Sequence, residues 1–522
     1  MDNIICTKDL TKKYGDFIAN ENINLEIARG EIRAIIGENG AGKTTLMNML
    51  YGVHAPTSGS ILINNKPVVF RSPQDAIECG IGMVHQHFRL SPSLTVYENI
   101  VLGLEEKRKV SIGKKELLVP LIDNKKECKK VEELIKKYNF SLDPMSKVKD
   151  LSVGARQRVE ILKMLYREVD ILILDEPTAV LIPQEIDELL KTLVNLRNLG
   201  KTIIIITHKL EEVKMCADNI SVMRHGKLVG TVKNDVAATT ESLAEMMVGR
   251  PVLLQVNKSG DPVNFDKVLY EVKNLSAVNS EGKKVVNDVS FKIHEKEVVG
   301  VAGIEGNGQS ELMYLLTGLM KPLSGSVTLK GEEVLQLHPD EIREAGIGII
   351  PEDRYQQGLC LSLPVSSNLI TGYHKKKQYC ENGLMKKKEI LENFKKQVEV
   401  FDIRLSDEDP MVSQLSGGNG QKVIVAREFS NDPDVLLAAQ PTRGIDVGAT
   451  EFIHNEILSM RDKGKGILLI SSELSECKGL ADTIIVMHNG EIVGKFDAEK
   501  VSFNELGLYM SGAKKMDKKD ME

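Results

Sequence analysis

The run at 37–45 has the residue types needed to hold a polyphosphate. It lies between an apolar run at 32–36 and a helical pattern at 46–50. Glycine permits backbone conformations and close approaches that a side chain would block, so the N–H groups of such a loop can surround phosphate oxygens. The start of the following helix adds the positive end of its dipole. The run consists of Gly37, Glu38, Asn39, Gly40, Ala41, Gly42, Lys43, Thr44 and Thr45.

Two side chains of this run carry chemistry of their own. Lys43 can reach the β- and γ-phosphates of a nucleotide, and the Thr44 hydroxyl can ligate Mg²⁺. A glycine-rich turn that binds nothing is the plain alternative. A strand, a glycine loop and a helix in this order favour the phosphate loop.

A pair of carboxylates follows a second apolar run, at 171–174. Such a run is typical of a buried parallel strand, and open α/β sheets bind their ligands at the carboxyl ends of these strands. Asp175 is therefore expected to hold Mg²⁺ through water, and Glu176 to act as the general base on the attacking water. His208 follows the buried run at 203–206 and can orient the γ-phosphate and that water.

Two further side chains are expected near the nucleotide. Gln86 has a neutral carbonyl oxygen that can contact Mg²⁺ and the attacking water. Tyr14 precedes the phosphate loop in the chain and can stack on adenine, although an exposed tyrosine at a strand end is the alternative. His85 and His87 are expected to be structural, because no third metal ligand has a fitting spacing.

The chain contains an internal repeat of domain size. Leu-Ser-Val-Gly-Ala-Arg-Gln at 151–157 returns as Leu-Ser-Gly-Gly-Asn-Gly-Gln at 415–421. Pro-Thr at 177–178 returns at 441–442, with the same spacing between the copies. This period is far too long for a solenoid repeat and indicates a tandem duplication. A polar, turn-rich stretch places the seam at 251–265, between a domain at 1–250 and one at 266–512, with a charged tail at 513–522.

The second copy lacks the chemical side chains of the first. Gln309 stands where Lys43 would be, and Glu352 where Gln86 would be. The carboxylate pair is replaced by Ala439 and Gln440, and the histidine by Ser472. We therefore expect that this half alone does not hydrolyse a nucleotide.

Composition excludes several classes of function. The chain has 522 residues, a net charge of −6 and no Trp, which argues against a nucleic-acid-binding surface as its main function. No apolar stretch is long enough to cross a bilayer and the first residues do not have the pattern of a secretory signal, so we expect neither a membrane span nor a leader. Seven scattered cysteines without a Cys-x-x-Cys pair indicate reduced thiols. Residues 102–149 follow a helical, lysine-rich pattern that predicts a solvated helix face.

The ordered motifs of the first half resemble those of ATP-binding cassette (ABC) transporter ATPases. The resemblance covers nearly the whole chain twice and implies an α/β fold with two tandem P-loop NTPase domains, each with a helical subdomain. It implies ATP and Mg²⁺ as ligands, with Thr44, Gln86 and Asp175 at the metal. Lys43, Gln86, Glu176 and His208 then correspond to the catalytic positions of that family.

Each cassette of that family has a signature motif, which corresponds to residues 151–157 and 415–421 here. Two cassettes of the family pair head to tail, so the signature motif of one half completes the ATP site of the other. The resemblance therefore adds residues of the second half to the site formed by the first. These are Ser416, Gly417, Gly418, Gln421 and Asp446. The reciprocal site would combine the stripped second loop with Val153 and Ile182, where a glycine and an aspartate are expected. The resemblance therefore implies one hydrolytic ATP site and one degenerate ATP site.

Within the family, the tandem form is similar to the ATPase subunits of bacterial sugar and nucleoside importers, and most to the nucleoside branch. This implies a peripheral protein on the cytoplasmic face of the cell membrane. Its partners would be two transmembrane permease subunits and, through them, an extracytoplasmic substrate-binding protein or lipoprotein. A monosaccharide importer subunit is the alternative, and a soluble tandem ABC protein without a transport role is a more distant one.

Overall fold

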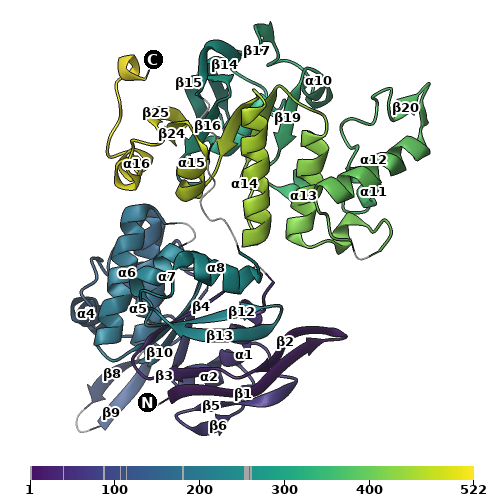
Figure 1. The fold of residues 1–522 in the computed structure, drawn as a ribbon. Coiled ribbons are helices and arrows are strands. Elements are labelled where there is room, and N and C mark those ends of the chain that lie inside the picture. The colour runs from purple at the N-terminus through teal and green to yellow at the C-terminus, as the bar shows by residue number, and fades with distance from the viewer. Residues whose placement is uncertain are drawn as a thin grey trace. The chain divides into compact units, whose positions relative to one another are not determined.

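The computed structural model describes residues 3–38, 40–85, 89–105, 107–112, 115–178, 181–251, 258, 262–405 and 407–521. The chain divides into two compact units, Met1–Val252 and Leu253–Glu522 (Figure 1). Each unit contains a mainly parallel central sheet, an antiparallel sheet and flanking helices.

In the described part of the first unit, the central sheet has the strand order β13-β12-β4-β11-β10-β7. Its strands are β4 (Ile32–Gly37), β7 (Ile81–Val84), β10 (Ile171–Asp175), β11 (Thr202–Ile206), β12 (Asn219–Arg224) and β13 (Lys227–Lys233). All neighbours are parallel except β12 and β13. Every residue of β10 and β11 is buried, as expected for strands covered on both faces. The parallel pairing brings the carboxyl ends of β4, β10 and β11 to one edge of the sheet.

The antiparallel sheet of the first unit is built around the long strand β1. Its members are β1 (Asn3–Tyr14), β2 (Phe17–Ile23), β3 (Glu26–Ala28), β5 (Ser58–Ile63) and β6 (Lys66–Val68). β1 extends to Tyr14, where the chain turns into β2.

The helices of the first unit connect these strands. They are α1 (Lys43–Leu50), α2 (Pro73–Glu78), α3 (Val96–Val101), α4 (Asn124–Lys137), α5 (Val153–Tyr166), α6 (Pro183–Asn198), α7 (Leu210–Cys216) and α8 (Thr240–Val248), with a short 3₁₀ turn at Val148–Asp150.

The helical prediction for 102–149 is wrong in its first part. An antiparallel hairpin, β8 (Lys107–Ile112) and β9 (Lys115–Ile122), precedes α4. Pro120 lies inside β9, and a proline cannot be placed in a helix interior without losing a hydrogen bond and clashing with the preceding turn. Proline is tolerated in a strand that pairs on one side only, as β9 does with β8 in the described structure.

The second unit repeats the topology of the first. Its central sheet, as far as the structure describes it, runs β19-β22-β23-β16-β24-β25, which is the order β7-β10-β11-β4-β12-β13 with each strand replaced by its counterpart. These strands are β16 (Val298–Ala302), β19 (Ile347–Ile350), β22 (Val435–Ala439), β23 (Gly466–Ile470), β24 (Thr483–His488) and β25 (Glu491–Asp497). The predicted duplication is therefore one of structure as well as sequence.

The remaining elements of the second unit follow the plan of the first. Its other strands are β14 (Asn264–Val278), β15 (Lys284–Glu295), β17 (Ser324–Leu329), β18 (Glu332–Glu333), β20 (Cys380–Glu381) and β21 (Leu384–Met385). Its helices are α9 (Gln309–Leu316), α10 (Pro339–Glu344), α11 (Val365–Asn368), α12 (Lys387–Val400), α13 (Gly417–Phe429), α14 (Val447–Asp462), α15 (Leu474–Leu480) and α16 (Phe503–Met510). A π-helical turn at Arg354–Gly358 and 3₁₀ turns at Val412–Gln414 and Lys518–Asp520 complete it.

Across the ranges given above, no helix combines the length and the apolar character that a membrane span needs.

Candidate active site

The glycine run of the first unit forms a loop between β4 and α1. Gly40 and Gly42 have φ angles of 81° and 94°, in the left-handed region that favours glycine. A Cβ atom on Gly42 would lie 2.5 Å from the carbonyl oxygen of Ala19, so no other residue fits there. The helix begins at once, with Leu46 N–H donating to the Gly42 carbonyl at 2.9 Å. The loop therefore has the backbone that the phosphate-binding prediction requires.

Lys43 is held inside this loop. Its side chain is buried, and Nζ donates to the carbonyl oxygens of Gly37 at 2.7 Å and Glu38 at 2.9 Å. Burial lowers the pKa of Lys43, while the nearby carboxylates of Glu176 and Asp175 act in the opposite direction. The ammonium group thus lies inside the loop, close to two acids.

The two acids come from the carboxyl end of β10. Asp175 is 9% exposed, and burial together with the charge of Glu176 raises its pKa to about 6. Glu176 has a φ angle of 47°, and its N–H donates to the Ile206 carbonyl of β11 at 2.9 Å. Glu176 Oε1 lies 3.0 Å from His208 Nδ1, whereas its Oε2 is buried and has no hydrogen-bond partner among the residues that the structure describes. The structure therefore brings Lys43, Asp175, Glu176 and His208 together.

These residues fit a magnesium ion that also binds phosphate. Two neighbouring carboxylates, one with a raised pKa and one with a buried oxygen lacking a partner, form a site of excess negative charge. The Thr44 hydroxyl lies at the start of α1 beside Lys43. Mg²⁺ usually takes one or two carboxylates and completes its shell with substrate phosphates and water.

Of the other predicted ligands, Tyr14 packs against a residue that follows the end of α1, and two lie outside the described residues. Tyr14 is 45% exposed and packs edge-on against His54, with 5.9 Å between ring centroids. Asn39 and Gln86 lie outside the described residues. His85 packs edge-on against Tyr51 at 6.0 Å, and burial lowers its pKa. No metal role is assigned to it.

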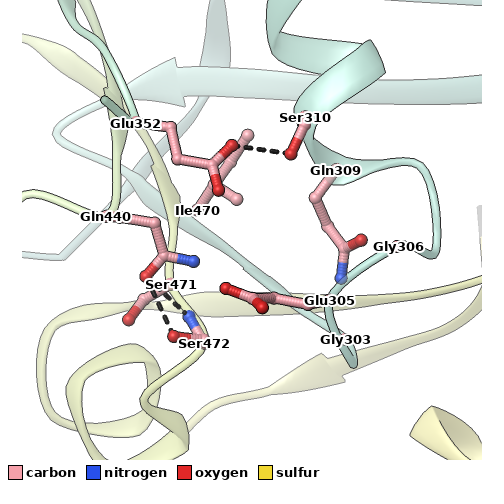
Figure 2. Close-up of a pocket in the computed structure, with 10 residues that line it drawn as sticks. All are labelled: Gly303, Glu305, Gly306, Gln309, Ser310, Glu352, Gln440, Ile470, Ser471 and Ser472. Atoms are coloured by element: carbon pink, nitrogen blue, oxygen red, sulfur yellow. Dashed lines mark hydrogen bonds between the residues drawn. The ribbon is translucent and has the colours of Figure 1, made fainter. Parts of the chain in front are cut away.

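The corresponding pocket of the second unit keeps the backbone and changes the side chains (Figure 2). Gly306 and Gly308 repeat the left-handed φ angles, at 88° and 103°, and Gln440 repeats the φ angle of Glu176, at 47°. The residues that line it are Gly303, Glu305, Gly306, Gln309, Ser310, Glu352, Gln440, Ile470, Ser471 and Ser472.

Internal hydrogen bonds link the polar groups of this second pocket. Gln309 Nε2 donates to the Ile304 carbonyl at 3.1 Å, much as Lys43 does in its own loop. The Ser310 hydroxyl donates to Glu352 at 2.6 Å. Gln440 accepts hydrogen bonds from both the N–H and the hydroxyl of Ser472. An amide thus replaces the ammonium group, and another amide replaces the carboxylate next to the strand end.

Comparison with known proteins identifies the family. The ABC transporter family model matches residues 20–179 and 286–443, one match in each unit. The chain belongs to the ABC transporter family. The match in the first unit includes the phosphate loop, Asp175 and Glu176.

Curated members of the ABC transporter family align with this chain from end to end. The nucleoside import ATP-binding protein NupA of Lactococcus lactis subsp. cremoris is 44% identical over 98% of both chains. The guanosine import ATP-binding protein NupO of Bacillus subtilis is 42% identical, again over 98% of both chains. The glucose import ATP-binding protein TsgD13 of Haloferax volcanii is 40% identical over 97% of this chain and 95% of its own.

The ABC signature motifs begin one helix in each unit. Ser152 caps α5, with its hydroxyl accepting the Ala155 N–H at 3.2 Å, and Ser416 caps α13 by accepting the Asn419 N–H at 3.4 Å. Gln421 of the second motif is buried, and within the described part of the chain its Nε2 has no hydrogen-bond partner. Asp446 caps α14 by accepting the Ala449 N–H at 2.7 Å, whereas its counterpart Ile182 has no side chain that can do so. Gly417 and Gly418 form the first turn of α13.

One pair of buried contacts was missed from the sequence. The hydroxyl of Thr178 donates to Glu212 at 2.6 Å, and that of Thr442 donates to Glu476 at 2.7 Å. These contacts hold the short segments that follow the carboxyl ends of β10 and β22. The repeated Pro-Thr pair could have drawn attention to the two threonines. The two glutamates are separated by the same spacing as the two Pro-Thr pairs, which a search for repeated positions could have found.

Proposed function

We propose that this chain is the ATP-hydrolysing subunit of an ABC importer that takes up nucleosides. The observation that supports hydrolysis is the set of Lys43, Asp175, Glu176 and His208 at the carboxyl edge of one sheet. The cargo is inferred from relatives named for nucleoside and guanosine import that align over 98% of this chain. A relative named for glucose import, at 40% identity, supports a monosaccharide as the second candidate.

The residues of the first unit have separate tasks in this mechanism. The phosphate loop and Lys43 bind the phosphates of ATP, and Tyr14 contacts the adenine ring. Thr44, Asp175 and Gln86 would hold Mg²⁺, which neutralises phosphate charge when it is bound. Glu176 accepts a proton from the attacking water, and the 3.0 Å contact with His208 orients the carboxylate for this task.

Hydrolysis in this proposal also depends on the signature motif of the second unit. Ser416, with the backbone of Gly417 and Gly418 at the start of α13, supplies hydrogen-bond donors and a helix dipole for the γ-phosphate. Gln421 and Asp446 support this motif. The Gln309, Ala439 and Gln440 pocket takes no part in the hydrolytic step.

The chain would act at the cytoplasmic face of the cell membrane as a peripheral protein. Two transmembrane permease subunits would bind it, and an extracytoplasmic substrate-binding protein or lipoprotein would deliver the cargo to them. We assign no nucleic-acid partner.

Uptake of labelled guanosine, ribose and galactose tests the proposal, in cells that contain or lack this chain. We expect a selective loss of guanosine uptake without the chain, restored by the wild type and not by Lys43→Ala. A selective loss of ribose or galactose uptake would contradict the nucleoside assignment and favour the second candidate. Unchanged uptake of all three would contradict both.

A further inference from the structure

The two signature helices begin in different electrostatic surroundings. In the first unit, the carboxylate of Glu185, from the first turn of α6, lies on the N-terminal end of α5. Its Oε1 accepts the Ser152 hydroxyl at 3.0 Å and the Gly154 N–H at 3.1 Å. A Cβ atom on Gly154 would lie 2.6 Å from the same oxygen, so this approach depends on glycine. An anion therefore already occupies the donors and the positive dipole end of this helix.

The second unit has no carboxylate at the equivalent position. Ala449 corresponds to Glu185 when the two units are aligned on their signature motifs. The Ser416 hydroxyl accepts hydrogen bonds from the Asn419 N–H at 3.4 Å and from its side-chain amide at 3.1 Å, which leaves its own proton as a donor. Asp446 lies beside Gly418, but its Oδ1 accepts the Ala449 N–H of its own helix.

A cation contributes to the second motif from the other side. The Arg354 guanidinium donates to the carbonyl oxygens of Gly417 at 3.3 Å, Arg443 at 2.7 Å and Gly444 at 3.2 Å. It binds carbonyl oxygens and therefore takes none of the N–H or hydroxyl donors of the motif. A carboxylate thus takes donors of the first signature motif. Beside the second motif, Asp446 accepts from its own helix and the cation binds carbonyl oxygens, so neither takes a donor of the motif.

We propose that Glu185 determines which signature motif serves ATP. Its carboxylate takes the hydrogen bonds that a γ-phosphate would require and repels the phosphate, so the motif of the first unit is closed to nucleotide. Ala449 leaves the motif of the second unit open. The inference rests on the proposed function, in which a signature motif donates to the γ-phosphate. It gives an electrostatic reason, besides the sequence differences at Val153 and Ile182, why the first motif does not serve ATP.

Transplanting the carboxylate tests this proposal in the full-length protein. Ala449→Glu is expected to lower kcat for ATP at least about tenfold, because the new carboxylate takes the donors of the working motif. KM for ATP and the affinity for a fluorescent ATP analogue should change little, since ATP binding depends mainly on the phosphate loop of the first unit. Ala449→Gln is the control of equal size without charge and should keep most of the turnover.

Two further variants complete the test. Glu185→Ala should leave turnover nearly unchanged, because its motif is not used. An acid in the first turn of a helix normally stabilises the helix, so Ala449→Glu is expected to fold. If its melting temperature nevertheless falls below the assay temperature, Ala449→Asp places a shorter carboxylate at the same position.

Three results would overturn the proposal. They are a folded carboxylate variant with wild-type turnover, an Ala449→Gln protein as slow as Ala449→Glu, and loss of turnover in Glu185→Ala. A wild-type protein that does not hydrolyse ATP would instead contradict the proposed function, so the two failures are distinguishable.

Discussion

At the scale of single residues, the two units place different side chains on the same backbone. Glu176 and Gln440 share a φ angle of 47°, a left-handed conformation that costs a residue with a side chain about 1 kcal/mol or more. The unfavourable conformation is kept in the second unit although the carboxylate is gone. The second unit therefore keeps the backbone at the strand end and differs from the first in its side chains.

The role of Glu176 as the base predicts a specific kinetic defect. Glu176→Gln should lower ATP turnover about 10²–10⁴-fold and leave ATP binding intact, because the amide keeps the shape of the side chain and cannot accept the proton. Steady-state hydrolysis and nucleotide binding measure the two effects separately. Gln440→Ala, at the matching position of the second unit, is the control. Near-normal turnover in Glu176→Gln would remove the general-base assignment.

The raised pKa of Asp175 predicts how stability depends on pH. Its folded-state pKa is about 6, above the ordinary value of 3.8, so the folded protein disfavours the ionised form. The contribution of this group to stability is complete below about pH 4 and is lost as the pH rises through 6. Asp175→Asn should therefore raise the free energy of unfolding above pH 6, by up to about 3 kcal/mol, in the absence of nucleotide and metal.

Denaturant unfolding of the two proteins between pH 4.5 and 8 tests this pH dependence. The gain from Asp175→Asn should shrink as the pH falls. A gain that does not depend on pH would mean that ionisation of Asp175 does not limit stability.

At the scale of secondary-structure elements, the reacting groups occupy the ends of strands and the starts of helices. The sequence predicted β10 and β11 well, because continuous apolar runs without charge mark fully buried parallel strands. It did not predict the β8–β9 hairpin, because the lysine-rich pattern of residues 102–149 is typical of a solvated helix, and Pro120 was the single residue that argued against one. It also could not locate Glu185, because only the packing of α6 against the start of α5 brings that carboxylate to Ser152.

The signature helices provide a matched pair for a prediction at this scale. Ser416→Ala and Ser152→Ala each remove a helix cap, so each should lower stability by about 0.5–2 kcal/mol. Only Ser416→Ala should also lower ATP turnover strongly, because the proposed γ-phosphate donor is in the second unit. Thermal unfolding and ATP hydrolysis of both variants check this. Equal turnover in the two variants would contradict the assignment of the second motif to hydrolysis.

At the scale of the whole molecule, one fold occurs twice, whereas the side chains proposed for catalysis occur only in the first copy. Both units have the same order of strands in the central sheet, because burial of apolar strands maintains a fold independently of its site. The prediction of two tandem cassettes is confirmed. The sequence alone also indicated the unequal sites, since the lost residues fall at the positions that the repeat assigns to them.

We infer that ATP hydrolysis depends on the phosphate loop of the first unit. The most direct measurement compares ATP turnover by the full-length Lys43→Ala and Gln309→Ala proteins with that of the wild type. Both positions start the helix after a phosphate loop, and both side chains are buried, so the two changes are structurally matched. We predict that Lys43→Ala abolishes turnover and that Gln309→Ala retains most of it. Equal loss in both variants, or hydrolysis that survives in Lys43→Ala, would contradict the account.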